Sequence, residues 1–257
     1  MSSPISEIVF ASQMSSPISE IVFASQMSSP ISEIVFASQM NSHKDALKLL
    51  GCCLETELPI LVFESAENGT LHDRIYNPHL AGFQPLSWTN RLRIAIDQDY
   101  VPKLTDFSLS APIPEGEYHI EHGVRTEKVP KETLGFLAAE FFSKSTINEK
   151  VDVYSFGVVL LSLLTGKRMQ HPLPFATPEN YLVDGLKAYA ETKRFNYEIV
   201  VDPFILQEGP WPGKEQQLQK FSLLALQCSC DLEENRPAIT EVAKQLRQIY
   251  QSASSNC

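Results

Sequence analysis

The chain has 257 residues, of which 43% are apolar and 20% are charged. A chain of this length buries a substantial core in one large domain or two modest ones, and its composition argues against wholesale disorder. The formal net charge is −10 and there is no run of Lys or Arg. Both features argue against a protein that binds nucleic acid nonspecifically.

Cysteine usage and hydropathy bear on location. Five cysteines, an odd number, and no secretion signal favour a reducing compartment. The most apolar run, Val158 to Leu164, is much shorter than the roughly 18 to 20 residues of a membrane span. Met1-Ser2 also lacks the Gly that N-myristoylation requires. We expect a cytoplasmic protein without a membrane span, peripheral at the plasma membrane only through its partners.

The first 39 residues are a perfect triplication. Met-Ser-Ser-Pro-Ile-Ser-Glu-Ile-Val-Phe-Ala-Ser-Gln occupies residues 1–13, 14–26 and 27–39. Solenoid repeats usually run ~20 to 50 residues, and the Pro near the start of each copy interrupts a continuous helix. A recent duplication, or an error in assembling the gene model, explains the identity better than a repeat fold. The Ser-Glu-Ile-Val-Phe-Ala part of one copy favours a short helix.

From Met40 the pattern becomes that of a folded domain. Short apolar runs separated by polar residues predict two antiparallel strands, and the Asn68-Gly69 turn precedes a short helical segment. Apolar residues at helical spacing predict a further helix, which the polar residues after Ile96 end at about two and a half turns. The elements expected in this part are strands over 48–53 and 59–64 and helices over 70–76 and 88–96.

The last hundred residues are predicted to be mainly helical. Helices are expected over 152–165, 179–193, 215–228 and from Pro237 onward. The first of these is apolar on every side, with Asp152 as its N-cap and Gly166 as its C-terminal stop, so we expect it to be the buried hub of the core. Strands followed by helices indicate an α+β arrangement.

Three short sequence motifs follow one another along the chain, and their order is informative. They are Leu104-Thr105-Asp106-Phe107-Ser108, Leu137-Ala138-Ala139-Glu140 and Asp152-Val153-Tyr154-Ser155-Phe156-Gly157. They resemble the magnesium-binding, substrate-loop and buried-helix landmarks of the eukaryotic protein kinase fold. Over residues 43–257 the chain resembles plant receptor-like kinases of the wall-associated type. Further matching strings include Leu49-Leu50-Gly51-Cys52-Cys53, Arg91-Leu92-Arg93-Ile94-Ala95 and Glu234-Asn235-Arg236-Pro237.

Two sequence motifs indicate which subgroup of the family the chain resembles. Leu104-Thr105-Asp106-Phe107-Ser108 and Pro114-Glu115-Gly116-Glu117-Tyr118 resemble a pseudokinase subgroup of cytoplasmic proteins that work beside nucleotide-binding leucine-rich-repeat immune receptors. The resemblance implies an α+β, protein-kinase-like fold with an incomplete N-lobe, whose first strands are absent, and a mainly helical C-lobe that lacks the catalytic loop. The implied domains are a triplicated, poorly ordered segment at 1–39 that resembles the end of the regulatory helix, an N-lobe remnant with the hinge at 40–85, a C-lobe at 86–250 and a disordered tail at 251–257.

The resemblance implies the loss of kinase chemistry. Phosphoryl transfer requires groups that hold ATP, neutralise its phosphates and orient the acceptor hydroxyl. In the family, a helix and a His-Arg-Asp loop with a downstream Asn precede Asp106, whereas residues 97–103 fill that place here without His, Arg or Asn. No Gly occurs before Gly51 and no Lys before Lys44, so the glycine-rich loop and the strand lysine are expected to be lost too. We expect no catalytic residue.

Some ligand-binding positions have counterparts. Asp106 matches the metal-binding Asp, although Ser108 replaces the usual Gly, and a single carboxylate holds Mg²⁺ only weakly. Glu64 and Ala66 fall in the segment that matches the hinge, which contacts adenine in the family. No cofactor is expected, and residual binding of ATP and Mg²⁺ is the alternative that these residues leave open.

Other matches concern the scaffold. Glu33 stands where the family has the carboxylate partner of the strand lysine. Glu140 and Arg236 match a buried ion pair that ties the substrate loop to the last helices. Asp152 matches a residue that hydrogen-bonds the catalytic loop, so helix capping is the role left to it.

Thr126 and Thr133 lie in the region that matches the activation segment. They are candidate phosphoacceptors for a partner kinase, because phosphate orders such loops through contacts with Arg. The alternative is a plain polar loop.

These features support three hypotheses. The first is a catalytically inactive adaptor or decoy in plant immune or receptor signalling, which contacts an immune receptor or an active receptor-like kinase. The second is an ATP-dependent serine/threonine kinase whose catalytic loop and N-lobe were lost in the gene model. The third is an unstable remnant without function.

Overall fold

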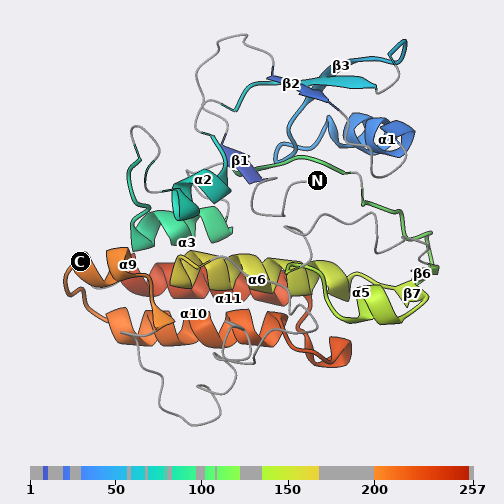
Figure 1. Ribbon diagram of the computed structural model, residues 1–257. Coiled ribbons are helices and arrows are strands. Elements are labelled where there is room, and N and C mark those ends of the chain that lie inside the picture. The colour runs from blue at the N-terminus through green and yellow to red at the C-terminus, as the bar shows by residue number, and fades with distance from the viewer. Residues whose placement is uncertain are drawn as a thin grey trace, which may run out of the picture.

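The computed structural model describes residues 8–10, 20–23, 30–56, 59–66, 69–77, 79, 83–96, 102–107, 109–121, 135–167 and 200–254. Most of the strands and one helix lie in the N-terminal part, and the C-terminal part is a bundle of helices (Figure 1). This is the mixed helix and strand content that the sequence predicts.

The N-terminal part is built on a three-stranded antiparallel sheet. Its strands are β2 (Glu20–Phe23), β4 (Ile60–Phe63) and β3 (Leu49–Cys53), in the order β2-β4-β3. The pairing of β3 with β4 confirms the two predicted antiparallel strands. A strand that the sequence did not predict, β2, covers the other side of β4.

The three identical repeats adopt different structures. The first contributes β1 (Ile8–Phe10), the second contributes β2, and the third forms α1 (Pro30–Met40). A helix is thus confirmed only for the third copy, and poor order is the wrong expectation for residues 30–40. Because the local sequence is the same in each copy, the neighbours of each copy must decide between helix and strand.

A second strand pair connects the N-terminal part with the segment that contains Asp106. β5 (Pro102–Leu104) pairs with β1 on one side. On its other side the Leu47 amide donates to the Leu104 carbonyl at 2.8 Å, and the Leu104 amide donates to the Asp45 carbonyl at 2.7 Å. A small core lies beside these strands and consists of Ala37, Leu47, Leu61 and Phe63, with Ile34, Leu49, Ala66 and Phe107 packed against it.

The helical bundle is organised around α6 (Lys150–Thr165). α3 (Trp88–Ile96) and α10 (Lys214–Cys228) pack against it, and α11 (Ile239–Ser254) packs against α10 and α3 (Figure 1). Residues 157–165 of α6 are all buried, which confirms the predicted hub. Among residues 150–156, by contrast, Val153 is the one buried residue, so the first turns are only partly covered.

Shorter elements complete the described chain. They are α2 (Leu71–Tyr76), β6 (Ile120–Glu121), α5 (Glu140–Ser143), β7 (Thr146–Ile147), α9 (Pro203–Gln207) and the 3-10 turn η3 (Glu233–Asn235). β6 and β7 pair antiparallel and join the segment after Asp106 to the start of the hub helix. Thr70 caps α2 by accepting a hydrogen bond from the Asp73 amide at 3.1 Å, and the helix confirms the predicted segment.

Three predicted boundaries are wrong. α6 begins at Lys150 with Glu149 as its N-cap, so Asp152 lies in the first turn and does not cap the helix. The last helix begins at Ile239, because Pro237 holds Arg236 in an extended conformation that delays the helix. That helix continues to Ser254, so the expected disordered tail does not begin at residue 251. The helix predicted over 179–193 lies outside the described residues.

The hub helix and α10 approach closely at Gly157. A Cβ atom at Gly157 would lie 2.7 Å from the Cβ of Cys228 and 2.8 Å from the backbone amide nitrogen of Ser229. Cys228 is fully buried, and this burial raises the pKa of its thiol to about 12, as expected for a cysteine that serves as a small apolar side chain. Only glycine therefore fits at this crossing.

We predict that Gly157→Ala lowers the free energy of unfolding by roughly 1–3 kcal/mol, because the added methyl group forces α6 and α10 apart. Urea denaturation followed by circular dichroism measures the change. Gly51→Ala is the matched control, since no atom lies within 4 Å of a Cβ built at Gly51. Unfolding of Gly157→Ala at the same urea concentration as the parent chain would contradict the predicted packing.

Candidate functional site

The predicted ligand-binding residues lie around the small N-terminal core. α1 carries Glu33, and the chain that leaves β5 carries Asp106. Asp106 has a φ of 61°, in the left-handed region that residues other than glycine rarely adopt. Such backbone conformations concentrate at functional sites, and the pairing of Leu104 with residues 45–47 fixes the chain two residues before Asp106.

Glu33 is a buried carboxyl group, only 6% exposed. Burial raises its pKa from 4.5 to about 7, and the negative charge of Asp106 contributes to the same shift. Among the described residues, no Lys or Arg forms an ion pair with Glu33. The structure thus brings Glu33 and Asp106 into electrostatic contact.

The two hinge candidates have contacts within the protein. The Glu64 amide donates to the Lys48 carbonyl at 2.9 Å, and the Glu64 carboxylate lies 3.7 Å from the Lys103 ammonium group. The Ala66 carbonyl accepts a hydrogen bond from the Gly69 amide at 3.1 Å. Glu64 therefore fastens the strand pair to β5, and Ala66 closes the turn that leads to α2.

A magnesium-bound nucleotide would have Asp106 as its one predicted carboxylate ligand. In the part of the chain that the structure describes, no three His, Cys, Asp or Glu side chains gather closely enough to hold a metal ion by themselves. Mg²⁺ in nucleotide sites is held by one or two carboxylates together with phosphate oxygens, so Asp106 would supply only part of its ligands. We therefore derive no chemical step that depends on a bound metal.

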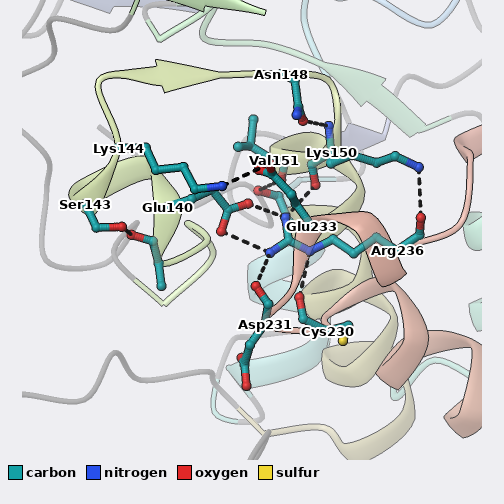
Figure 2. Close-up of polar contacts among 12 residues, drawn as sticks. Glu140, Ser143, Lys144, Asn148, Lys150, Val151, Cys230, Asp231, Glu233 and Arg236 are labelled. Carbon is teal, nitrogen blue, oxygen red and sulfur yellow. Dashed lines mark hydrogen bonds and ion pairs between the residues drawn. The ribbon is translucent and has the colours of Figure 1, made fainter.

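The predicted ion pair between Glu140 and Arg236 is present. The Arg236 guanidinium group donates to both oxygens of Glu140, with Nη2 at 3.0 Å from Oε2 (Figure 2). Both side chains are buried, at 5% and 2% exposure. Glu140 opens α5, and Arg236 follows η3. The pair joins two segments that are far apart in the sequence.

Every donor of Arg236 is engaged. Besides Glu140, it donates from Nε to the Cys230 carbonyl at 2.7 Å, from Nη1 to the Lys150 carbonyl at 3.0 Å and from Nη2 to the Asp231 carbonyl at 3.2 Å. An arginine has five N–H donors, and all five have acceptors here. A lysine could not replace it, because an ammonium group has three donors and lacks the planar fork.

A second buried ion pair was not predicted from the sequence. Arg91 donates from Nη2 to the Asp202 carboxylate at 2.6 Å and from Nη1 to the Leu163 carbonyl at 2.7 Å. Arg91 is 1% exposed and Asp202 is 4% exposed. Because Leu163 is in the last turn of α6, this pair satisfies one of the carbonyl groups that a helix end leaves without a partner.

The sequence contained an indication that Arg91 is buried and paired with an opposite charge. It lies three residues after Trp88 and directly before Leu92 on the apolar stripe of the predicted helix, where a charged side chain must be buried with a partner. Asp202-Pro203 is also a recognisable helix start, and Asp202 accepts a hydrogen bond from the Phe204 amide at 2.9 Å. The sequence could thus have indicated both residues, although not that they meet.

Comparison with known proteins settles the family. Residues 93–246, more than half of the chain, match the family described as Protein kinase domain. This chain belongs to the protein kinase family. Its similar proteins in Arabidopsis thaliana include Wall-associated receptor kinase 3, which is 32% identical over 81% of this chain and 30% of that protein.

Two shorter kinase relatives are also similar. Non-functional pseudokinase ZRK2 of Arabidopsis thaliana is 31% identical over 81% of this chain and 64% of that protein. Serine/threonine-protein kinase ZRK1 of the same plant is 30% identical over 84% of this chain and 67% of that protein. Together these relatives support the expected membership of the plant receptor-like kinases. The chain spans 30% of the length of the wall-associated receptor kinases that it matches.

The remaining predicted positions of the kinase domain have different outcomes. Thr126 and Thr133 lie outside the described residues, so their role as phosphoacceptors stays a prediction. Asp152 is exposed in the first turn of α6, and among the described residues no hydrogen bond or ion pair involves its carboxylate. None of the helices that the structure describes has the length and apolar character needed to cross a membrane.

Replacing Glu140 tests how strongly the kinase domain depends on the buried ion pair. We predict that Glu140→Gln costs ~3–5 kcal/mol of unfolding free energy, because it leaves the buried charge of Arg236 without its counterion. Urea denaturation measures the loss. Lys144→Gln is the control, since Lys144 pairs with Glu233 at 2.9 Å on the surface and its loss should leave the midpoint unchanged. Equal effects of the two substitutions would contradict the prediction.

The raised pKa of Glu33 predicts a dependence on pH. Its folded-state pKa of about 7 lies above the ordinary 4.5, so stability contributed by the protonated group is lost as the pH rises through 7. Glu33→Gln removes this loss and should stabilise the chain at pH 8 by at most about 3 kcal/mol, with little effect at pH 4.5. Thermal melting at both values measures the difference, and Glu55→Gln, on the surface, is the control. A benefit that is the same at both pH values would contradict this origin.

Proposed function

We propose that this chain is a catalytically inactive member of the kinase family, a pseudokinase that acts through contacts with other proteins. The observation that carries the proposal is the short connection between α3 and β5. Only residues 97–101 separate Ile96 from Pro102, and they contain no His, Arg or Asn. This connection stands where the family has its catalytic loop, so the base and the second metal ligand have no counterpart.

The alignment with the relatives supports a missing segment. The aligned region spans 239 positions, but 81% of the 257 residues of this chain is about 208. About 30 positions of the relative therefore have no residue of this chain opposite them. A deletion of that size is large enough to remove a loop together with the end of the preceding helix.

The environment of Glu33 supports the same proposal. In an active kinase this carboxylate pairs with a strand lysine, which must be in place for catalysis. Among the described residues no lysine pairs with Glu33, and burial raises the pKa of its carboxyl group. Glu33 is thus a buried carboxyl group that is not half of an ion pair in the described part of the chain.

The proposed role is that of an adaptor or decoy in plant receptor or immune signalling. The resemblance to immune-associated pseudokinases and the similarity to Non-functional pseudokinase ZRK2 support it. The segment after Asp106 offers a contact surface: residues 111–119 are all exposed, and Tyr118 is 87% exposed. Exposed aromatic side chains are frequent anchors of protein interfaces. The proposed partners are an immune receptor or an active receptor-like kinase, met in the cytoplasm.

The alternative function is an ATP-dependent serine/threonine kinase whose catalytic loop and N-lobe are missing only from the gene model. The intact ion pair of Glu140 and Arg236 and the match over residues 93–246 favour it. Sequencing full-length transcripts across Asp97-Gln98 separates the alternatives. An intervening coding segment would support the kinase, and an uninterrupted junction would support the pseudokinase.

A phosphotransfer assay tests the proposed inactivity directly. With ATP, Mg²⁺ and a general protein substrate, the chain should show no turnover above that of buffer, because no residue in the described part of the chain is placed to accept the proton of the substrate hydroxyl group. The kinase region of Wall-associated receptor kinase 3 is the positive control. Turnover that disappears in an Asp106→Asn variant would overturn the proposal, since it would show that Asp106 still holds a catalytic metal.

A further inference from the structure

The triplicated segment occupies three sites without a change of sequence. Ile-Val-Phe pairs with Leu104, Lys103 and Pro102 in β1, and the same three residues pair with Val62, Leu61 and Ile60 in β2. Two partners of unrelated sequence accept one segment, so the recognition runs through backbone hydrogen bonds. This is the manner in which an extended peptide adds a strand to the edge of a sheet.

The end of the helix that contains the third copy is held by Asn41, the second residue after that copy. Asn41 donates from Nδ2 to the Leu49 carbonyl at 2.9 Å and accepts from the Leu49 amide at 2.8 Å. These two bonds anchor the end of α1 to β3. In the sequence, Ser15 and Ser28 stand at the positions after the first and second copies that correspond to Asn41, so no amide side chain is available there. Each chain thus carries one anchored copy and two copies that form strands.

β4 has two edges that can form backbone hydrogen bonds, and β2 pairs with one of them. β3 covers one side of β4, and four residue pairs from Glu20 to Phe23 cover the other. Without β2 that side would present unpaired N–H and C=O groups, which is how exposed edges template pairing with other chains. Its occupant, β2, is held by four backbone residue pairs.

We propose that this edge of β4 is a strand-accepting site for the Ser-Glu-Ile-Val-Phe segment, and that two copies of the chain exchange their segments across it to form a dimer. A second copy is the fitting partner because it carries a sequence already seated in the site. The contacts are the same within one chain and between two, so exchange changes only the tether. Tethered segments have effective concentrations in the mM range, so the dimer forms at high protein concentration or on joint refolding.

Cross-strand cysteines test the exchange. Ile21 lies opposite Val62 in the register, and directly opposed residues come within disulfide reach. We would refold a mixture of Ile21→Cys and Val62→Cys chains, oxidise it and map the disulfides by mass spectrometry. The expected result is a disulfide between the two introduced cysteines that joins two chains. Leu50→Cys replaces Val62→Cys in the control mixture, because Leu50 lies on β3 and not opposite β2.

Two results would overturn the proposal. If a single chain with both substitutions forms the disulfide and the mixture does not, the site is filled only within its own chain. If neither forms it, the segment does not occupy β4.

A second measurement needs no substitution. Light scattering of the parent chain at rising concentration should show dimers that an excess of the synthetic 13-residue repeat returns to monomers. Dimers that the peptide leaves unchanged, or their absence at every concentration, would count against the exchange. Neither experiment depends on phosphotransfer, so the proposed inactivity can fail while this site stands.

Discussion

Two buried arginines hold the hub helix at its two ends, and the arrangement of the C-terminal part depends on them. Arg236 donates to the carbonyl of Lys150, the first residue of α6, and Arg91 donates to the carbonyl of Leu163 in the last turn. The Asp202 amide donates to the Leu164 carbonyl at 2.9 Å, and the Gly166 amide to the Ser162 carbonyl at 3.0 Å. At the buried C-terminal end of α6 the last carbonyl groups must find partners within the protein, because water cannot reach them.

The ion pairs of Arg236 and Arg91 stabilise the scaffold. Their balanced charges differ from the environment of Glu33, which belongs to the predicted ligand-binding region. Arg236 and Arg91 each face a carboxylate that balances their charge, whereas Glu33 is buried with a raised pKa and no such partner among the described residues. Burial of one unpaired carboxyl group is tolerable only if it is protonated. The described part of the chain thus contains two buried arginine–carboxylate pairs that hold its helical part together, and one buried carboxyl group without such a pair.

The sequence predicted the elements whose signals are local. Turn residues around Gly69, the alternation of apolar runs and the stripe from Leu218 to Cys228 led to β3, β4, α2 and α10. The start of α6 was missed because Glu149 caps it without a side-chain hydrogen bond, so there was no capping signal to read. The contact of Arg91 with Asp202 joins residues 111 positions apart. No periodicity encodes such a pair, and only the resemblance to a family supplied the corresponding pair of Glu140 and Arg236.

The triplication and the short connection before β5 are structurally linked. β5 has only three residues, and only residues 97–101 separate it from α3. The segment at residues 45–47 covers one side of β5, and the first copy of the repeat covers the other as β1. A strand that loses a neighbour leaves an open edge, and open edges promote association between chains. The first copy of the repeat therefore closes an edge of β5 that would otherwise be open. The same adaptability leaves both copies without a unique site, because nothing in their sequence distinguishes β4 from β5 or one chain from the next.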